Sequence, residues 1–169
     1  MSGPVSHPAS WPEDQLLAKC RITFSRASGP GGQNRNKVET SVQIEYLPNK
    51  IIASASERRT QIENRKVAMQ RLRCRLAVEV RTQNQGTCSE IWKTYCRDGR
   101  IDISEANLAW PSVLAELIDV LAEQEWDLST AAERLETSSS QLVKLLKKYP
   151  PSFALLNRER ILRGHRSLD

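Results

Sequence analysis

Three of the chain's seven glycines fall within four residues, in the segment Arg26-Ala-Ser-Gly-Pro-Gly-Gly-Gln-Asn-Arg-Asn-Lys37. Glycines grouped in this way let a backbone adopt positive φ and approach a partner closely, because no Cβ intervenes. Between Arg26 and Lys37 there is no Asp, Glu, His or Cys, so the segment lacks the usual general bases and nucleophiles. Gln33 offers amide and backbone groups, which can position a water molecule or donate a hydrogen bond to a developing oxyanion. Chemistry of this kind requires a site that a larger partner supplies.

This glycine-rich segment can also be interpreted without chemistry, as a mobile turn between two strands. It does not fit a phosphate-binding loop, because no Gly-Lys-Ser/Thr sequence and no helical pattern follow it. The segment is much longer than a hairpin needs, which favours a functional role. Arg26, Arg35 and Lys37 give it a basic rim suited to phosphate contacts.

The sequence on both sides of the loop predicts strands. Residues 20–25 alternate polar and apolar side chains, and residues 38–47 alternate well enough for a second strand. Pro48-Asn49 indicates a turn, so residues 51–55 are expected to form a third strand as a hairpin partner. A short helix is expected after Pro12, where acidic residues precede two leucines.

A basic helix is expected from about Gln61 to Val80. Its apolar stripe consists of Met69, Leu72, Leu76 and Val80. Residues 57–81 hold eight Lys or Arg against three Glu. By charge alone, a contact with a polyanion and a solvated helix face are equally good interpretations. The predicted fold of residues 12–81 is α+β, with a small antiparallel sheet, a packed basic helix and an exposed loop carrying Gly31-Gly32-Gln33.

The glycine-rich segment and the sequence after it resemble a known protein family. Gly31-Gly32-Gln33, in the setting SRASGPGGQNRNKVETSV, closely resembles the Gly-Gly-Gln motif of class-I peptide chain release factors. The following stretch, LPNKIIASASERRTQIENRKVAMQRLRCRL, is similar to that family's strand, turn and basic helix in order and spacing. Two departures occur: Arg35 and Val38 stand where bacterial release factors usually have Val and Thr, and Asn49-Lys50 replaces the usual Thr-Gly. Neither departure touches the tripeptide.

The resemblance implies an enzyme that hydrolyses the peptidyl-tRNA ester in the ribosomal peptidyl transferase centre, without a cofactor. It assigns catalysis to Gly31, Gly32 and Gln33. The backbone N–H of Gln33 would place the water and contact the transition state, and a glutamine methyltransferase would methylate its side chain. The partners implied are the rRNA of the large subunit and the P-site peptidyl-tRNA. The residues then expected to contact rRNA are Arg26, Arg35, Lys37, Arg58, Arg59, Arg65, Lys66, Arg71 and Arg75.

The chain most resembles the stand-alone, rescue-type members of the family, which release stalled peptides without reading a stop codon. About 25 residues precede the loop, so we expect no codon-recognition domain. Two other functions remain open on the sequence. The chain could be a nucleic-acid-binding regulator that uses its C-terminal part, or a non-catalytic ribosome-binding factor.

The rest of the chain predicts three further segments. Residues 1–11, rich in Pro, Ser and Gly, are expected to be disordered, and residues 82–111 are interpreted as an irregular connector. Residues 112–165 are expected to form a small all-helical domain with a helix-turn-helix-like pair. Capping-box patterns at Thr130 and Ser138 mark two helix starts, Pro150-Pro151 ends the second helix, and Gly164 ends a last helix beginning near Ser152. One basic face and no evident dimerisation helix favour an RNA or ribosome contact over sequence-specific DNA reading.

Composition sets the remaining limits. The net charge of +5 is segregated, since residues 82–140 carry 4 basic and 11 acidic side chains while both flanking segments are basic. The mean hydropathy is −0.51, and no uninterrupted apolar stretch has the length of a membrane span. The N-terminus lacks the basic and apolar regions of a secretion signal. The four cysteines and two histidines lack metal-ligand spacing. We therefore expect a cytoplasmic monomer with no metal and no membrane partner.

Overall fold

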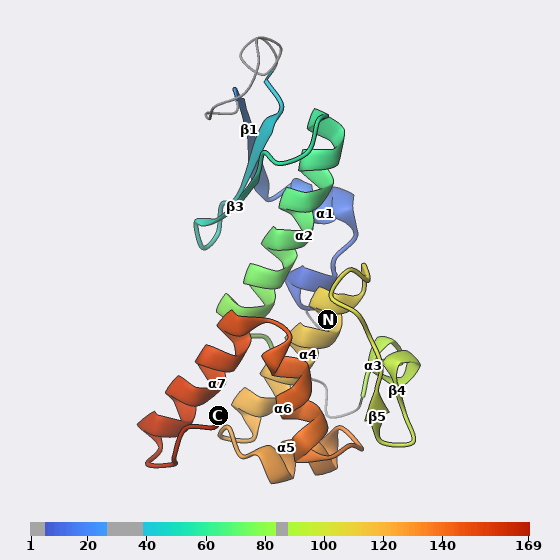
Figure 1. Cartoon of the computed structure of the whole chain (residues 1–169), viewed down its shortest axis with the longest axis vertical. Helices are drawn as coiled ribbons and strands as arrows, with labels where there is room; N and C mark the ends of the chain where they lie inside the picture. Colours follow the sequence, from blue (N-terminus) through green and yellow to red (C-terminus); the bar gives the residue numbers. More distant parts are fainter. Residues whose placement is uncertain (1–5, 27–38, 84–87) are drawn as a thin grey trace, which may run out of the picture. The chain divides into compact units, whose positions relative to one another are not determined.

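The structure, a computed structural model, describes residues 6–26, 39–83 and 88–169. Its contacts divide the chain into two compact units. Residues 11–76 form the sheet unit, and residues 77–169 with residues 6–10 form the helical unit. The boundary falls within one helix, α2. Helices and small antiparallel sheets alternate along the chain (Figure 1), which confirms the predicted α+β class.

The sheet unit contains helix α1 (Glu13–Leu17), strands β1 (Cys20–Ser25), β2 (Ser41–Tyr46) and β3 (Ile51–Ala55), and most of α2 (Gln61–Glu79). The strands pair antiparallel in the order β1-β2-β3. Alternate side chains of β2 and β3 are buried, as a period of two requires, and the buried residues of α2 follow a helical stripe. The buried side chains of these elements are Val42, Ile44, Tyr46, Ile51, Ala53 and Ala55 of the strands and Asn64, Ala68, Met69, Leu72, Cys74 and Leu76 of α2.

The elements predicted for this unit are confirmed, with one shift at β2. We expected that strand to begin at Val38, whereas the ladder begins at Ser41, which pairs with Ser25 at the end of β1. Pairing cannot extend beyond the end of the partner strand, so residues 39 and 40 lie outside the ladder. The helix α2 begins with a capping box that the sequence analysis missed. The Thr60 Oγ1 accepts a hydrogen bond from the Glu63 N–H at 3.2 Å, and the Glu63 carboxylate accepts one from the Thr60 N–H at 3.3 Å.

The helical unit is built around α4 (Trp110–Glu123), whose residues are buried along most of its length. Around it lie a short 3-10 turn (Pro8–Ser10), α3 (Glu90–Tyr95), a hairpin of β4 (Cys96–Arg97) and β5 (Arg100–Ile101), and the helices α5 (Leu128–Arg134), α6 (Ser139–Lys147) and α7 (Pro150–Leu162). Figure 1 shows α6 beside α7, with α5 leading into α6 through a short turn. The expected helix-turn-helix-like pair is thus α5 and α6.

Regular structure is present in two places where the sequence suggested none. In the N-terminal segment, the ring of His7 is buried, and its Nε2 lies 3.1 Å from the Val80 carbonyl oxygen. In the segment 82–111, Trp92 of α3 is buried and its indole N–H donates to the Leu135 carbonyl at 3.0 Å. The 3-10 turn, α3, β4 and β5 are each too short to show a hydrophobic period in the sequence. Their positions depend on single buried side chains such as His7 and Trp92.

Helix ends in the helical unit follow the predicted signals with two corrections. Ser138 caps α6, since its Oγ accepts from the Gln141 N–H at 3.3 Å. Thr130 is wrong as the cap of α5: Asp127 holds that place and accepts from the Thr130 N–H at 2.8 Å. The pair Pro150-Pro151 occupies the first turn of α7, where a missing N–H is tolerated, so α7 begins two residues before Ser152. Gly164 follows α7 with a φ of +79°, as expected for a terminating glycine.

None of the helices formed by the described residues is long and apolar enough to cross a membrane. Within residues 6–26, 39–83 and 88–169, no group of three or more His, Cys, Asp or Glu side chains is placed to hold a metal ion.

Candidate nucleic-acid interface at the base of segment 27–38

The strands β1 and β2 flank the glycine-rich segment along the chain. They pair up to Ser25 and Ser41, so the chain leaves β1 and enters β2 at the same end of the sheet. Arg26 directly follows β1 and is exposed. The other residues predicted in this segment, Gly31, Gly32, Gln33, Arg35 and Lys37, lie outside the described residues.

Asn64 in the first turns of α2 fixes the entry into β2. Its side chain is fully buried, and its Nδ2 donates to the carbonyls of Thr40, at 2.7 Å, and Arg58, at 3.0 Å. Its Oδ1 accepts from the Arg58 N–H at 2.9 Å. Gln61 adds a hydrogen bond from Nε2 to the Glu39 carbonyl at 3.1 Å. Because a buried amide is costly to leave unpaired, these bonds hold residues 39–40 and 58 together.

Neither Asn64 nor Gln61 is among the site residues predicted from the sequence. A signal was present, because Asn64 lies four and eight residues before Ala68 and Leu72 and therefore falls on the apolar stripe of α2. A buried polar residue on such a stripe needs partners, and here the partners are backbone groups beside the glycine-rich segment.

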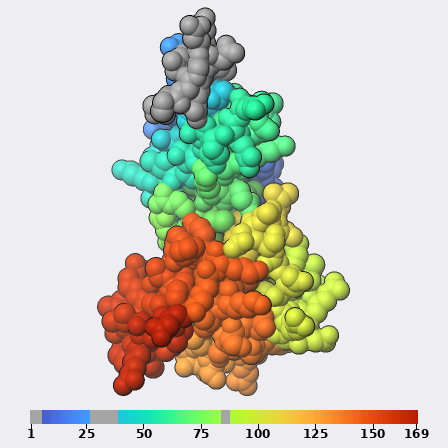
Figure 2. Space-filling view, viewed as in Figure 1, coloured from blue at the N-terminus to red at the C-terminus, as the bar shows by residue number. Residues whose placement is uncertain are grey.

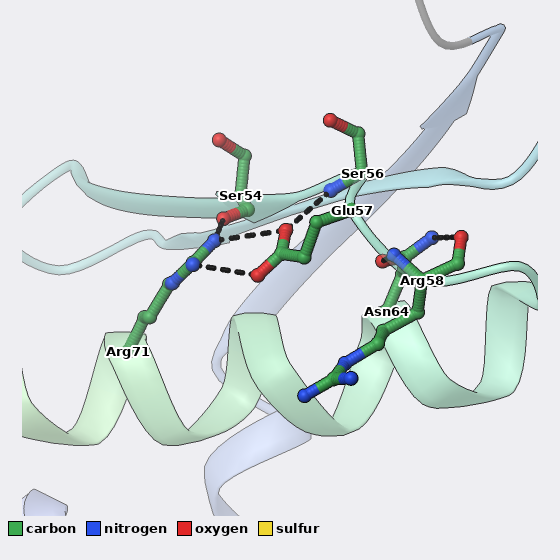
Figure 3. Close-up of polar contacts among 6 residues, drawn as sticks. All are labelled: Ser54, Ser56, Glu57, Arg58, Asn64 and Arg71. Carbon is green, nitrogen blue, oxygen red and sulfur yellow. Dashed lines mark hydrogen bonds and ion pairs between the residues drawn. The ribbon is translucent and has the colours of Figure 1, made fainter.

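Arg71, one of the predicted RNA contacts, is engaged within the sheet unit (Figure 3). Its guanidinium donates to Glu57 through Nη2–Oε1 at 2.6 Å and Nη1–Oε2 at 3.3 Å, and to the Ser54 carbonyl at 2.8 Å. The Glu57 carboxylate also accepts from the Ser56 N–H at 3.0 Å. Hydrogen bonds from the backbone N–H groups of Glu57 and Ser56, together with Arg71, lower the pKa of Glu57.

Two more of the predicted cations have partners inside the chain. Arg75, one turn after Arg71, donates through Nη1 to the Ile52 carbonyl. Arg65 pairs with Glu13 of α1 across 3.5 Å. Three of the six arginines and lysines predicted on residues 58–75 therefore have a structural role in addition to any contact with RNA.

The other three, Arg58, Arg59 and Lys66, are exposed and form no ion pair with any residue in the described part of the chain. The Glu63 carboxylate nearby is bound to Thr60. Hydrogen bonds from Thr60, followed by the charges of Arg58 and Arg59, lower the pKa of Glu63. Both Glu57 and Glu63 are thus held as anions, with pKa values moved away from the neutral range that suits a general base. The arrangement favours phosphate binding and backbone positioning over proton transfer.

A comparison with known protein families matches most of the sheet unit and the first part of the helical unit. The RF-1 domain matches residues 16–108, more than half of the chain and including the whole glycine-rich segment. The chain belongs to the RF-1 domain family of class-I release factors. The predicted resemblance is therefore confirmed.

Relatives of this RF-1 domain protein include full release factors from bacteria and organelles. It is 34% identical over 128 residues to peptide chain release factor 1 of Leptospira biflexa, which covers 62% of this chain and 36% of that protein. It is 40% identical over 80 residues to the chloroplastic peptide chain release factor PrfB1 of Arabidopsis thaliana, covering 47% of this chain and 17% of that one. A mitochondrial peptide chain release factor 1-like protein of Rattus norvegicus is 46% identical over 56 residues, which is 33% of this chain and 15% of the rat protein. The chain spans well under half the length of these relatives.

Proposed function

We propose that this RF-1 domain protein releases peptides from ribosomes by hydrolysing the ester of peptidyl-tRNA, and that it does so without reading a codon. The observation that carries the proposal is the fixed base of segment 27–38. Paired strands and the buried amide of Asn64 secure both ends of a segment whose sequence contains Gly31-Gly32-Gln33.

In the proposed reaction a water molecule attacks the ester carbonyl carbon, and the bond from that carbon to the 3′ oxygen of the tRNA breaks. The proton lost by the water balances the one gained by the leaving 3′ oxygen, so the products are a free peptide and a free tRNA. The backbone N–H of Gln33 would contact the developing oxyanion or the water, a role that needs no ionisable side chain. This agrees with a glycine-rich segment that carries no local base. We include methylation of the Gln33 side chain, which the resemblance implies and mass spectrometry of the native protein would test.

The codon-independent mode of action rests on how the protein would be held on the ribosome. Exposed cations near the base of the segment, Arg26, Arg58, Arg59 and Lys66, can bind rRNA phosphates. The last 29 residues of the chain add seven further Lys or Arg against two acidic residues. Binding energy from such contacts depends on RNA phosphates and is independent of the mRNA sequence in the decoding site.

The test is peptide release from ribosomes programmed with a labelled peptidyl-tRNA in the P site. Four complexes are compared: a stop codon in the A site, a sense codon, an mRNA truncated after the P site, and an isolated large subunit. We expect release that does not require the stop codon, and no release by the Gly32→Ala variant. Release at stop codons alone would contradict the codon-independent mode. Ribosome binding without release from any complex would make the protein a non-catalytic ribosome-binding factor.

A further inference from the structure

One face of α6 is exposed and basic. Ser140, Val143, Lys144 and Lys147 follow each other at helical spacing, opposite the buried residues Leu142, Leu145 and Leu146. Figure 2 shows the orange segment that contains α6 at the surface of the helical unit, beside the red α7. The turn before α6 is fixed by neighbours on the other side: Thr137 Oγ1 donates to the Gly99 carbonyl at 2.6 Å, and the Leu135 carbonyl accepts from Trp92. These contacts anchor the N-terminal end of α6 to α3 and to the turn between β4 and β5.

The two lysines of this face differ from three other cations of the helical unit, which have partners within the chain. In the same unit, Arg134 pairs with Glu123 at 2.8 Å and Arg163 pairs with Glu159 at 2.8 Å, and Lys148 donates its ammonium to the Ile103 carbonyl. Lys144 and Lys147 form no ion pair with any residue that the structure describes. The sequence between Glu136 and Glu159 contains no Asp or Glu, so α6 itself contributes cations and no carboxylate to this face.

Two hollows flank the lysines. One has a volume of about 540 Å³ and is lined by Leu128, Ser139, Ser140, Val143, Lys144, Lys147 and Leu168. Leu168 is fixed there by Asn157, whose side chain donates to the Leu168 carbonyl at 3.0 Å and accepts from its N–H at 2.8 Å. The other hollow, beside β5, is lined by Arg100, Ile101, Asp102, Gln141 and Lys144, which adds one more cation and one carboxylate. The face thus combines lysine ammonium groups, serine hydroxyls and a shallow apolar floor.

We propose that this face of α6 binds the backbone of double-helical RNA across its minor groove. Lys144 and Lys147 contact phosphates, the hydroxyl of Ser140 meets ribose 2′-hydroxyls, and Val143 with Leu128 and Leu168 packs on the sugars. The minor groove of A-form RNA is wide, shallow and lined by 2′-hydroxyls, which fits such a surface. The proposal rests on the proposed function in one respect: rRNA is then the natural source of the duplex.

Base-specific reading of DNA fits this face less well. The bidentate contacts that read bases in the major groove come mainly from Arg, Asn and Gln, and the exposed positions of α6 carry Ser and Lys instead. Gln141, the amide of this helix, uses its Oε1 to accept from the Ile101 N–H at 3.3 Å. Lysines bind phosphates as point charges and give little sequence discrimination.

The test measures binding of the full chain to a fluorescent RNA duplex of about 20 base pairs across a salt titration. A DNA duplex of the same sequence and an RNA duplex of unrelated sequence serve as comparisons. The variant Lys144→Gln/Lys147→Gln should bind RNA about tenfold more weakly at low salt. The slope of log affinity against log salt should become shallower by about 1.5 to 2, because two phosphate contacts are lost. Wild type should bind both RNA sequences alike and the DNA more weakly.

Two further variants separate contact from fold and from total charge. Lys144→Arg/Lys147→Arg keeps both positive charges. It also keeps a cation beside the Phe153 ring, whose centroid lies 5.2 Å from Lys147 Nζ, so this variant should bind RNA as the wild type does. Lys19→Gln/Lys93→Gln removes the same charge at exposed positions off α6 and should leave the salt slope unchanged. An equal loss in this control, equal binding of DNA, or unchanged RNA binding by Lys144→Gln/Lys147→Gln would overturn the proposal. The duplex-binding assay contains no ribosomes or peptidyl-tRNA. Its outcome is therefore independent of the peptide-release assay, and either proposal can be contradicted while the other stands.

Discussion

Each unit contains a buried polar side chain on a helix that binds a neighbouring segment of the chain through several hydrogen bonds. In the sheet unit, Asn64 holds Thr40 and Arg58 through three hydrogen bonds of 2.7 to 3.0 Å. In the helical unit, Asp119 of α4 accepts from Arg81 Nη1 at 2.8 Å and from the Thr82 Oγ1 and N–H at 2.6 and 3.2 Å. Thr40 stands two residues after segment 27–38, whereas Thr82 follows the end of α2. We infer that one contact positions the chain next to the segment that carries the proposed chemistry, whereas the other only stabilises the fold.

The two units also differ in the apolar core that surrounds these contacts. The core of the helical unit includes the fully buried Trp92 and Trp110 and the leucines and isoleucine of α4. The described part of the sheet unit has no fully buried tryptophan, and its largest fully buried side chains are Leu16, Ile44, Leu72 and Leu76. Because the free energy gained by burial scales with apolar area, the sheet unit depends more on its polar contacts.

The largest expected effect is the loss of release in Gly32→Ala. The added Cβ restricts the backbone of the segment that carries the proposed chemistry, and loss of an oxyanion contact lowers rates by about 10² to 10³. Gln33→Ala should lose less activity, because its backbone N–H remains.

Gly164 serves as the control glycine for this prediction. Its φ is +79°, and an added Cβ would meet no atom of the described residues within 4 Å. Gly164→Ala should cost about 1 kcal/mol of stability and leave release unchanged. Equal loss in the Gly32 and Gln33 variants would contradict the assigned source of catalysis.

Asn64→Ala and Asp119→Ala test the comparison directly. Each leaves buried or half-buried partners unpaired, so each should lower the free energy of unfolding by about 2 to 4 kcal/mol, measured by urea denaturation. At a temperature where both variants are folded, Asn64→Ala should also reduce the release rate about tenfold at saturating protein, because the base of the segment is no longer fixed. Asp119→Ala should release at the wild-type rate. If both variants lost release to the same degree, the loss would reflect stability and Asn64 would not be a positioning residue.

The third prediction separates the free cations of the sheet unit from the engaged ones. Arg58→Glu with Lys66→Glu should weaken ribosome association about tenfold and make its salt dependence shallower, since fewer counterions are released. Arg71→Gln should instead lower stability by up to about 1 kcal/mol, as expected for an exposed ion pair, with a smaller change in affinity. Unchanged affinity of the double variant throughout a salt titration would make the surface formed by residues 58–66 a solvated face.

The smallest effect expected is a dependence of stability on pH in the helical unit. The Nδ1 of His7 accepts from the Ala9 N–H at 3.0 Å, so the ring is neutral, with its proton on Nε2 toward Val80. Burial lowers the pKa of His7 below its ordinary 6.5, and this outweighs the opposing charge of Asp119; the charge of Arg81 adds to the lowering. The unfolded chain therefore binds the proton first, and the free energy of unfolding should fall as the pH drops below about 6.5. In His7→Gln the slope between pH 7 and 5 should flatten; an identical slope would assign the titration to another group.

The sequence predicted the sheet unit well because its signals are local. The alternation in residues 20–25 and 51–55 and the helical stripe of α2 each follow from the period of one element. The capping signal at Ser138 and the terminating Gly164 are local in the same sense, and both are confirmed.

What the sequence did not predict depends on contacts between distant residues. Trp92 binds the carbonyl of Leu135, 43 residues away, and this contact gives structure to a segment with no period of its own. Asn64 reaches Thr40 across 24 residues, which no pattern within α2 could reveal. The engagement of Arg71 and Arg75 could not be predicted either, because a basic helix has the same sequence whether its arginines face solvent, RNA or a neighbouring strand.

The contacts of Arg71 and Arg75 have a consequence for aggregation. β3 is an edge strand of the sheet, and the two carbonyls that these guanidinium groups bind, those of Ile52 and Ser54, are two residues apart along it. Carbonyls at this spacing point the same way along the edge, where a strand from a second molecule would otherwise pair. Edge strands with free acceptors are templates for such pairing, and charged side chains are a common protection. The two arginines therefore occupy the carbonyls of Ile52 and Ser54 on the edge strand. A second copy of the chain would have to displace both side chains before it could pair with β3 and extend the sheet.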